Sequence, residues 1–183
     1  MALFTSFGRN PSGESLKKIS VSGQYADGVF RNISPTEMMV NKTSLLKMTW
    51  KFFNKPKATR PPAPLPSVRT DLKGLVSSKP VLIWFGHSSY FLRINGKNIL
   101  VDPVMSGYAS PFSFGARSFP GTDIYTPADL PEIDILLITH DHYDHLDHRT
   151  VQALKPTVKQ VCTSLGVGAH LEYWGFDRAI IKE

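Results

Sequence analysis

The chain has 183 residues, 42% of them hydrophobic, with 21 basic and 15 acidic side chains and a formal net charge of +6. This length and apolar content predict a globular domain with a buried core and exclude a disordered chain. The single cysteine, Cys162, excludes an intramolecular disulfide. The charge excess is moderate, and both an anionic substrate and a solvated basic face would explain it.

The first ten residues lack the basic and apolar regions of a secretory signal. No run approaches the roughly twenty apolar residues that span a membrane. We therefore expect a soluble, cytoplasmic protein.

Three segments precede the main domain. Residues 1–35 are rich in Ser, Gly and Asn, and we expect an irregular arm. Residues 36–54 predict a basic amphipathic helix, with apolar side chains at helical spacing and Lys47 and Lys51 on the opposite face. That helix could dock on the protein's own core, which is the favoured interpretation, or enter a membrane interface or partner groove. Residues 55–79 contain five prolines between 56 and 66 and predict an extended connector.

Residues 80–183 predict a layered α/β domain. Apolar runs indicate strands at 81–85, 89–94, 98–101, 133–139 and 158–163, and Asn95-Gly96 indicates a tight hairpin turn between the second and third. Helices are expected from Asp147, a capping residue, to about 154, and over 168–174. The loop over 103–131 is too long to be an idle connection. Strands that alternate with helices after a hairpin are typical of an α/β fold.

A metal-binding pattern follows the fourth strand. His140, His142, Asp144 and His145 lie within six residues, although the chain has only six histidines. Two imidazoles at i and i+2 can bind one ion, and a carboxylate with a third imidazole can contribute to a second. Imidazole and carboxylate without thiolate suit Zn²⁺, with Fe or Mn as competitors. Two close ions would lower the pKa of a shared water to give hydroxide near neutral pH, which indicates hydrolytic chemistry.

Five ordered motifs extend this pattern into a family resemblance. They are WFGHSS at 84–89, LVDP at 100–103, ASP at 109–111, PEID at 131–134 and HYDHLD at 142–147. This succession resembles the metallo-β-lactamase fold, in the branch of N-acyl-phosphatidylethanolamine-hydrolysing phospholipase D and the ascorbate-6-phosphate lactonase relatives. The resemblance covers residues from about 60 to the C-terminus. It implies a metal-dependent hydrolase of phosphodiesterase or lactonase type that uses a di-metal-activated hydroxide.

The resemblance also implies roles for individual residues. His140 and His142 match ligands of the first metal, and Asp144 and His145 match ligands of the second; Asp144 would also orient the attacking water. Asp102 matches a carboxylate beside the metals that could fix a ligand imidazole. His87 matches a histidine near the pocket, where it would contact substrate. A histidine that is merely hydrogen-bonded at a strand end explains His87 nearly as well.

The chain also departs from the family pattern. The complete family fold is an αββα sandwich, whose second half supplies a further His, a bridging Asp and a final His, and these have no counterpart here. We therefore expect the N-terminal half of such a sandwich behind an N-terminal extension. Two consequences follow: the four loop donors should bind metal weakly, and an exposed sheet face should favour self-association or the binding of a missing C-terminal half.

Two function classes remain open. The first is the hydrolase, acting on a small-molecule or lipid phosphodiester or ester, with peripheral membrane contact through the basic helix as a refinement. The second is a noncatalytic, truncated fragment or interaction module that acts through the basic helix and the Pro-rich segment. A nucleic-acid partner is not expected, because the basic residues cluster on the helix and no aromatic stacking platform is interleaved with them.

Overall fold

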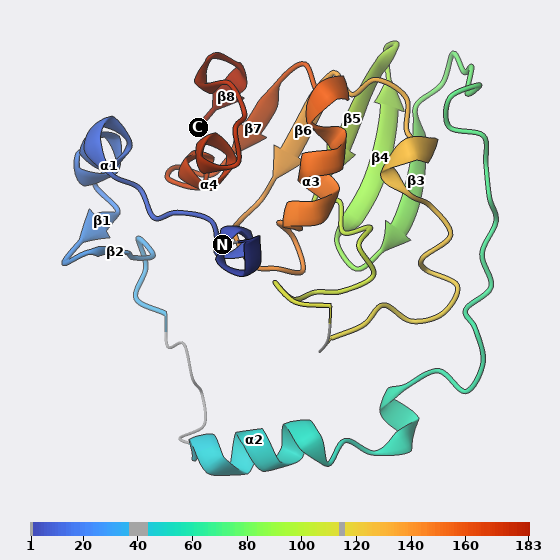
Figure 1. The fold of residues 1–183 in the computed structure, drawn as a ribbon, viewed down its shortest axis with the longest axis horizontal. Helices are drawn as coiled ribbons and strands as arrows, with labels where there is room; N and C mark the ends of the chain where they lie inside the picture. The colour runs from blue at the N-terminus through green and yellow to red at the C-terminus, as the bar shows by residue number, and fades with distance from the viewer. Residues whose placement is uncertain (1, 37–43, 114–115) are drawn as a thin grey trace.

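A six-stranded mixed sheet forms the centre of the computed structural model, which describes residues 2–36, 44–113 and 116–183. Strands β3 (Val81–Gly86), β4 (Ser89–Ile94) and β5 (Lys97–Val101) form an antiparallel meander. Strands β6 (Ile135–Ile138), β7 (Val161–Thr163) and β8 (Ile181–Lys182) continue the sheet in parallel, in sequence order (Figure 1). The mixed α/β layering expected from the sequence is confirmed.

The hairpin between β4 and β5 turns where the sequence predicted. Asn95 and Gly96 both have positive φ, at 50° and 73°, as a two-residue type I′ turn requires. This turn pairs Ile94 with Lys97 and places Tyr90 opposite Val101. The meander therefore brings the end of β5 beside the start of β4, close to the β3–β4 turn.

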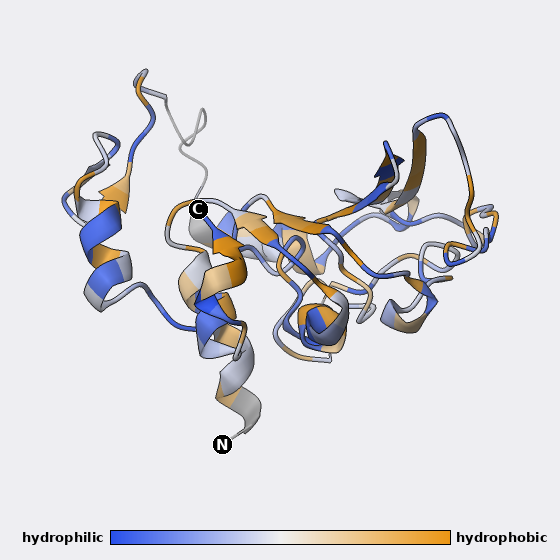
Figure 2. Cartoon of the chain, turned by 90° about the horizontal axis from the view of Figure 1, so that it is seen from above, coloured by the Kyte–Doolittle hydropathy of each residue, from blue (hydrophilic) through white to orange (hydrophobic). Residues whose placement is uncertain are grey.

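Helices α3 (His148–Leu154) and α4 (Gly168–Tyr173) cover one face of the sheet (Figures 1 and 2). The Asp147 side chain caps α3 by accepting a hydrogen bond from the backbone N–H of Arg149 at 3.1 Å. The core between these layers contains fully buried side chains from β4 to β7 and from both helices, namely Phe91, Leu100, Leu136, Ile138, Val151, Leu154, Val161 and Leu171.

The opposite face of the sheet is apolar and open at its β3 edge. Leu82 and Trp84 alternate with the inward-facing Ile83 and are 61% and 67% exposed. Their cross-strand neighbours Tyr90 and Leu92 are only partly buried. This is the exposed face expected for half of a sandwich.

The N-terminal residues are more ordered than the sequence indicated. A 3₁₀ helix η1 (Ala2–Phe7), the helix α1 (Gly13–Ser20) and the short hairpin β1 (Tyr25–Ala26) and β2 (Val29–Phe30) replace the expected irregular arm. Ser12, at the N-cap of α1, makes no capping side-chain bond. Burial of Ile19 stabilises the helix instead, since this side chain is 2% exposed and packs against Gly166. Such tertiary contacts override a weak local signal.

Helix α2 (Leu45–Phe53) occupies the described part of the predicted basic helix, and residues 37–43 lie outside the described residues. Leu46, Trp50 and Phe53 are 83%, 66% and 78% exposed, so the favoured interpretation, docking on the protein's own core, is wrong for these side chains. The connector that follows is extended apart from the 3₁₀ turn η2 (Lys57–Thr59). None of the helices in the described ranges combines the length and apolar character needed to cross a membrane.

Candidate metal centre

The His-rich loop begins where β6 ends, at the edge of the sheet. Backbone N–H groups of His145 and Leu146 both donate to the carbonyl of His142, at 2.9 and 2.8 Å. The resulting turn folds residues 140–145 back on themselves. The side chains of His140, His142 and His145 therefore project from one compact loop.

His140 and His142 are placed as a pair of nitrogen donors. Nε2 of His140 lies 3.2 Å from Nδ1 of His142. Two nitrogens bound to one tetrahedral ion at about 2.05 Å would be separated by about 3.3 Å. The observed spacing fits a single metal ion held between the two rings.

Asp102 and Thr139 orient the imidazoles. The Asp102 carboxylate is 1% exposed and accepts hydrogen bonds from the backbone N–H of Thr139 at 2.8 Å, its hydroxyl at 2.7 Å, and Nδ1 of His145 at 2.8 Å. The Thr139 hydroxyl also lies 3.0 Å from Nδ1 of His140. These bonds place the ring protons of His140 and His145 on Nδ1. The Nε2 atom of each ring keeps its lone pair, which a metal ligand requires.

A second group of donors forms around Asp144. Its Oδ2 lies 3.1 Å from Nε2 of His87 and 3.8 Å from Nε2 of His145. One ligand atom from each of these three residues falls within 4.8 Å of the others, a spacing compatible with one ion. His87 has a φ of 46°, and this unusual backbone conformation in the β3–β4 turn aims its ring at Asp144.

The two groups adjoin each other. The ring centroids of His140 and His145 are 3.9 Å apart, and those of His87 and His145 are 5.1 Å apart. Burial holds the pKa of His140 below its usual range, and the neighbouring His145 and His142 lower that pKa further. The neutral ring is the form that binds metal. The donors thus fit a pair of ions in neighbouring positions.

All six residues singled out from the sequence meet at this edge: His87, Asp102, His140, His142, Asp144 and His145. Thr139 was missed, although its place directly before the motif was a signal. Three further acidic or histidine side chains near the loop have other contacts. Asp147 caps α3, His148 packs on Trp174, and His170 contacts Asp141.

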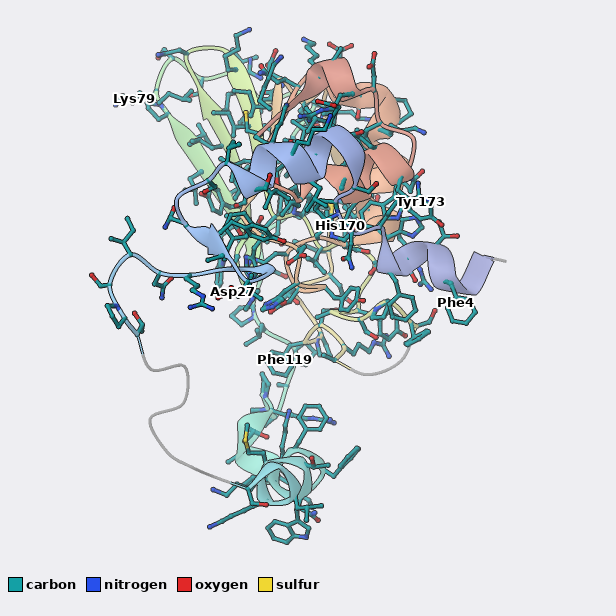
Figure 3. All side chains as sticks on the ribbon, turned by 90° about the vertical axis from the view of Figure 1, so that its left-hand side faces the viewer. Phe4, Asp27, Lys79, Phe119, His170 and Tyr173 are labelled. Carbon is teal, nitrogen blue, oxygen red and sulfur yellow. The ribbon has the colours of Figure 1, made fainter. Side chains whose placement is uncertain are left out.

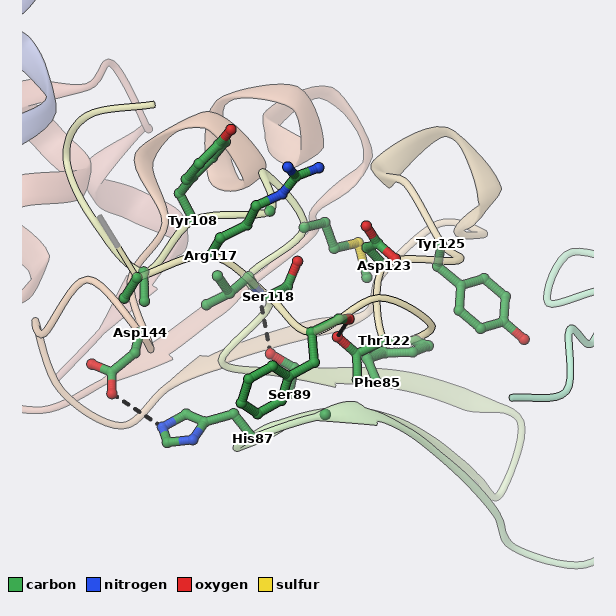
Figure 4. A pocket seen from close by; sticks show the side chains of 17 residues that line it. Phe85, His87, Ser89, Tyr108, Arg117, Ser118, Thr122, Asp123, Tyr125 and Asp144 are labelled. Carbon is green, nitrogen blue, oxygen red and sulfur yellow. Dashed lines mark hydrogen bonds and ion pairs between the residues drawn. The ribbon is translucent and has the colours of Figure 1, made fainter. Parts of the chain in front are cut away.

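A cavity of about 340 Å³ opens beside Asp144 and His87 (Figure 4). Apolar side chains of the long loop and of β3 form much of its wall, including Phe85, Met105, Phe119 and Tyr125. Arg117 also lines it, and its guanidinium has no ion-pair partner among the described residues. The loop over 103–131 therefore builds a pocket next to the donors.

The family comparison matches this part of the chain. Residues 97–183, which include Asp102 and the whole His-rich loop, match the family model described as "Beta-lactamase superfamily domain". This part of the chain has the metallo-β-lactamase fold. The fold explains the order of the sheet and helices and the position of the donors at a strand end.

Several proteins are similar to this chain over part of their own length. An uncharacterized protein of Mycobacterium tuberculosis is 37% identical over 165 residues, which are 88% of this chain and 44% of the relative. N-acyl-phosphatidylethanolamine-hydrolyzing phospholipase D 1 of Caenorhabditis elegans is 36% identical over 84 residues, 42% of this chain and 22% of the relative. A metal-dependent hydrolase of Caldivirga maquilingensis is 37% identical over 65 residues, 36% of this chain and 23% of the relative.

The chain spans less than half the length of each of these relatives. Among solved structures, CmlA, a diiron beta-hydroxylase from Streptomyces venezuelae, has 32% sequence identity and a TM-score of 0.44. That match covers 59% of this chain and 21% of CmlA.

Proposed function

We propose that the protein containing this chain is a metal-dependent hydrolase of the metallo-β-lactamase superfamily. The observation that carries the proposal is the meeting of two donor groups, His140 with His142 and Asp144 with His145 and His87. Asp144 and His87 of the second group also line the pocket. The similarity to a relative named a metal-dependent hydrolase supports it. Bound metal would polarise the scissile group and supply hydroxide near neutral pH.

The protein side chains have separate tasks around that chemistry. His140 and His142 would hold one ion and His145 the other, with Asp102 keeping the His145 ring in place. Asp144 would orient the attacking water through its Oδ2. His87, 3.1 Å from that oxygen, can contact the substrate or hold a proton at Nε2.

The pocket favours a substrate with an apolar body and an anionic group. Phe85, Met105 and Phe119 offer apolar contact, and Arg117 can pair with a phosphate oxygen. We therefore propose phosphodiester cleavage, of the kind named in the nematode relative, ahead of lactone hydrolysis. Zinc is the proposed metal because all donors are imidazole or carboxylate, and iron or manganese are the alternatives that such donors accept.

A direct test compares hydrolysis of bis(p-nitrophenyl) phosphate and of a neutral lactone by the full chain, reconstituted separately with zinc, iron and manganese. Asp144→Asn should lower activity by about 100-fold or more, whereas Asp27→Asn, in the exposed β1–β2 turn, should leave it unchanged. Equal activity in the Asp144→Asn chain would refute the proposed role. Preference for the lactone would replace phosphodiester cleavage with lactonase activity.

Helix α2 favours a second candidate function, an interaction module at an anionic membrane surface. Trp50, Phe52 and Phe53 are exposed on α2, beside Lys51 and Lys55. Apolar side chains with flanking lysines are the composition of interfacial helices. With this candidate we propose a cytoplasmic localisation with peripheral contact at the membrane surface through α2. Sedimentation with phosphatidylserine vesicles at low salt should capture the chain, and Trp50→Glu should abolish capture; no capture of the unmodified chain would refute it.

A further inference from the structure

The N-terminal segment, defined here as residues 4–10, lies against α4 and the His-rich loop although it is far away in sequence (Figures 1 and 3). We propose that this segment, acting through His170, positions the metal-binding loop. His170 is then a positioning residue, and the N-terminal segment is part of the site. The proposal rests on the metal centre proposed above.

Contacts on the α4 side fix the segment in place. The indole Nε1 of Trp174 donates to the carbonyl of Thr5 at 2.7 Å, and the backbone N–H of Arg9 donates to Nδ1 of His170 at 3.0 Å. The Arg9 guanidinium lies over the Tyr173 ring, 5.4 Å from its centroid. Two hydrogen bonds and one cation–π contact therefore join residues 161 to 169 positions apart.

His170 transmits this contact to the loop. Because Nδ1 accepts from Arg9, the ring proton must be on Nε2, which lies 3.4 Å from Oδ2 of Asp141. This interaction holds the pKa of the Asp141 carboxyl below its usual range. Asp141 stands between His140 and His142, so restraining its side chain restrains the backbone that carries both donors.

Aromatic packing makes a second connection. The Phe7 ring meets the Tyr143 ring edge-on at a centroid distance of 6.4 Å, and it meets Phe112 of the long loop at 5.6 Å. Tyr143 stands between His142 and Asp144. Phe7, Asn10, Asp141 and His142 also share the wall of a cavity of about 400 Å³. The segment is thus connected to the loop at two alternate positions between the donors, to Asp141 through His170 and to Tyr143 directly through Phe7.

Gly8 shows how closely the segment is fitted. It has a φ of 70°, and a Cβ added there would lie 2.0 Å from Nδ1 of His170. A side chain at this position is therefore incompatible with the Arg9–His170 bond. Gly28 is a matched control, since it also has a positive φ, 80°, but a Cβ there would meet nothing within 4 Å.

The first experiment measures amide hydrogen exchange in the metal-free chain, for Gly8→Ala, Gly28→Ala and the unmodified protein. The reporters are the loop amides of His145 and Leu146, both bonded to the His142 carbonyl. Gly8→Ala should accelerate their exchange by at least about tenfold through local opening, with Gly28→Ala unchanged. Unchanged exchange in Gly8→Ala, in a chain that remains folded by urea titration, would overturn the proposal.

A second measurement separates this proposal from the metal centre itself. Cobalt titration, followed by the visible spectrum of the bound ion, should show weaker binding in Gly8→Ala and in His170→Asn than in Gly28→Ala. His170→Asn retains an acceptor near the Nδ1 position but loses the donor toward Asp141. If the unmodified chain gives no cobalt spectrum, the proposed metal centre fails and exchange still decides the positioning role. Equal cobalt affinity in all variants would refute the positioning role of His170 and leave the proposed metal centre standing.

Discussion

The buried carboxylate of Asp102 accepts a hydrogen bond from Nδ1 of His145 at 2.8 Å, joining the end of β5 to the last donor of the loop after β6. Asp102 has a φ of 41°, a left-handed conformation that aspartate tolerates better than most residues. His87 also has a positive φ, and both residues lie beside the His145 ring. Such strain persists only where the surrounding contacts hold it.

Replacing Asp102 by asparagine should weaken both the fold and the metal site. The asparagine can keep the positive φ, but it loses one oxygen acceptor and the charge that orients the His145 ring. We expect metal affinity to fall by about 10–100-fold and the free energy of unfolding to fall by roughly 1–3 kcal/mol. Metal titration and urea denaturation measure the two effects. Asp27→Asn is the control, and unchanged metal affinity in Asp102→Asn would contradict the orienting role.

Arg117→Gln should distinguish the two proposed substrate types. Arg117 lines the pocket, and its guanidinium can form an ion pair with an anionic oxygen, which glutamine cannot. The KM for a phosphodiester should rise by roughly tenfold, because a charge-assisted bond is worth more than about 1.5 kcal/mol, while the KM for a neutral lactone should change little. Steady-state kinetics on both substrates provide the comparison. A similar change for both would mean that Arg117 does not recognise the anion.

Stability should decrease below neutral pH, in part through His148. Burial, against Trp174, lowers the pKa of His148 below the usual value of about 6.5. Below about pH 6.5 the unfolded chain therefore binds more protons than the folded chain. The contribution of His148 to the free energy of unfolding is fully present above that pH and is lost as the pH falls toward the folded-state pKa. The urea midpoint should be lower at pH 5 than at pH 7.5, and His148→Gln should reduce this difference. An identical pH profile in the variant would contradict the assignment.

The open sheet face should cause self-association. Leu82 is 61% exposed on β3, next to Trp84 and Leu92. Leu82→Lys should shift sedimentation-velocity profiles toward the monomer, since a charge opposes burial of that face. Val68→Lys, at a connector position that is 84% exposed, should not. Association that is unaffected by Leu82→Lys would locate the contact elsewhere.

The strands and the donor loop could be predicted because their signals are local. Asn95-Gly96 specifies its turn directly, and the spacing of His140, His142 and Asp144 indicates donors without knowledge of their neighbours. Asp102 was assigned through the family resemblance, and the structure supplies the bond to His145 that explains it.

The N-terminal elements could not be predicted in the same way. Helix α1 lacks a side-chain cap and depends on burial of Ile19 against Gly166, a contact between distant parts of the chain. The link from Arg9 through His170 to Asp141 is equally invisible in the sequence, where His170 matches no motif. The exposed side chains of α2 show that amphipathic periodicity predicts a helix without specifying what its apolar side contacts.

The central claim is that His140, His142, Asp144 and His145 hold metal, and zinc titration of the chain by calorimetry tests it most directly. We predict weak but specific binding, because His140 and His142 give their ion two protein ligands, fewer than the usual three or four. His142→Ala should abolish it, and His148→Gln, whose ring is outside the centre, should retain it. Binding that survives His142→Ala unchanged would contradict the account.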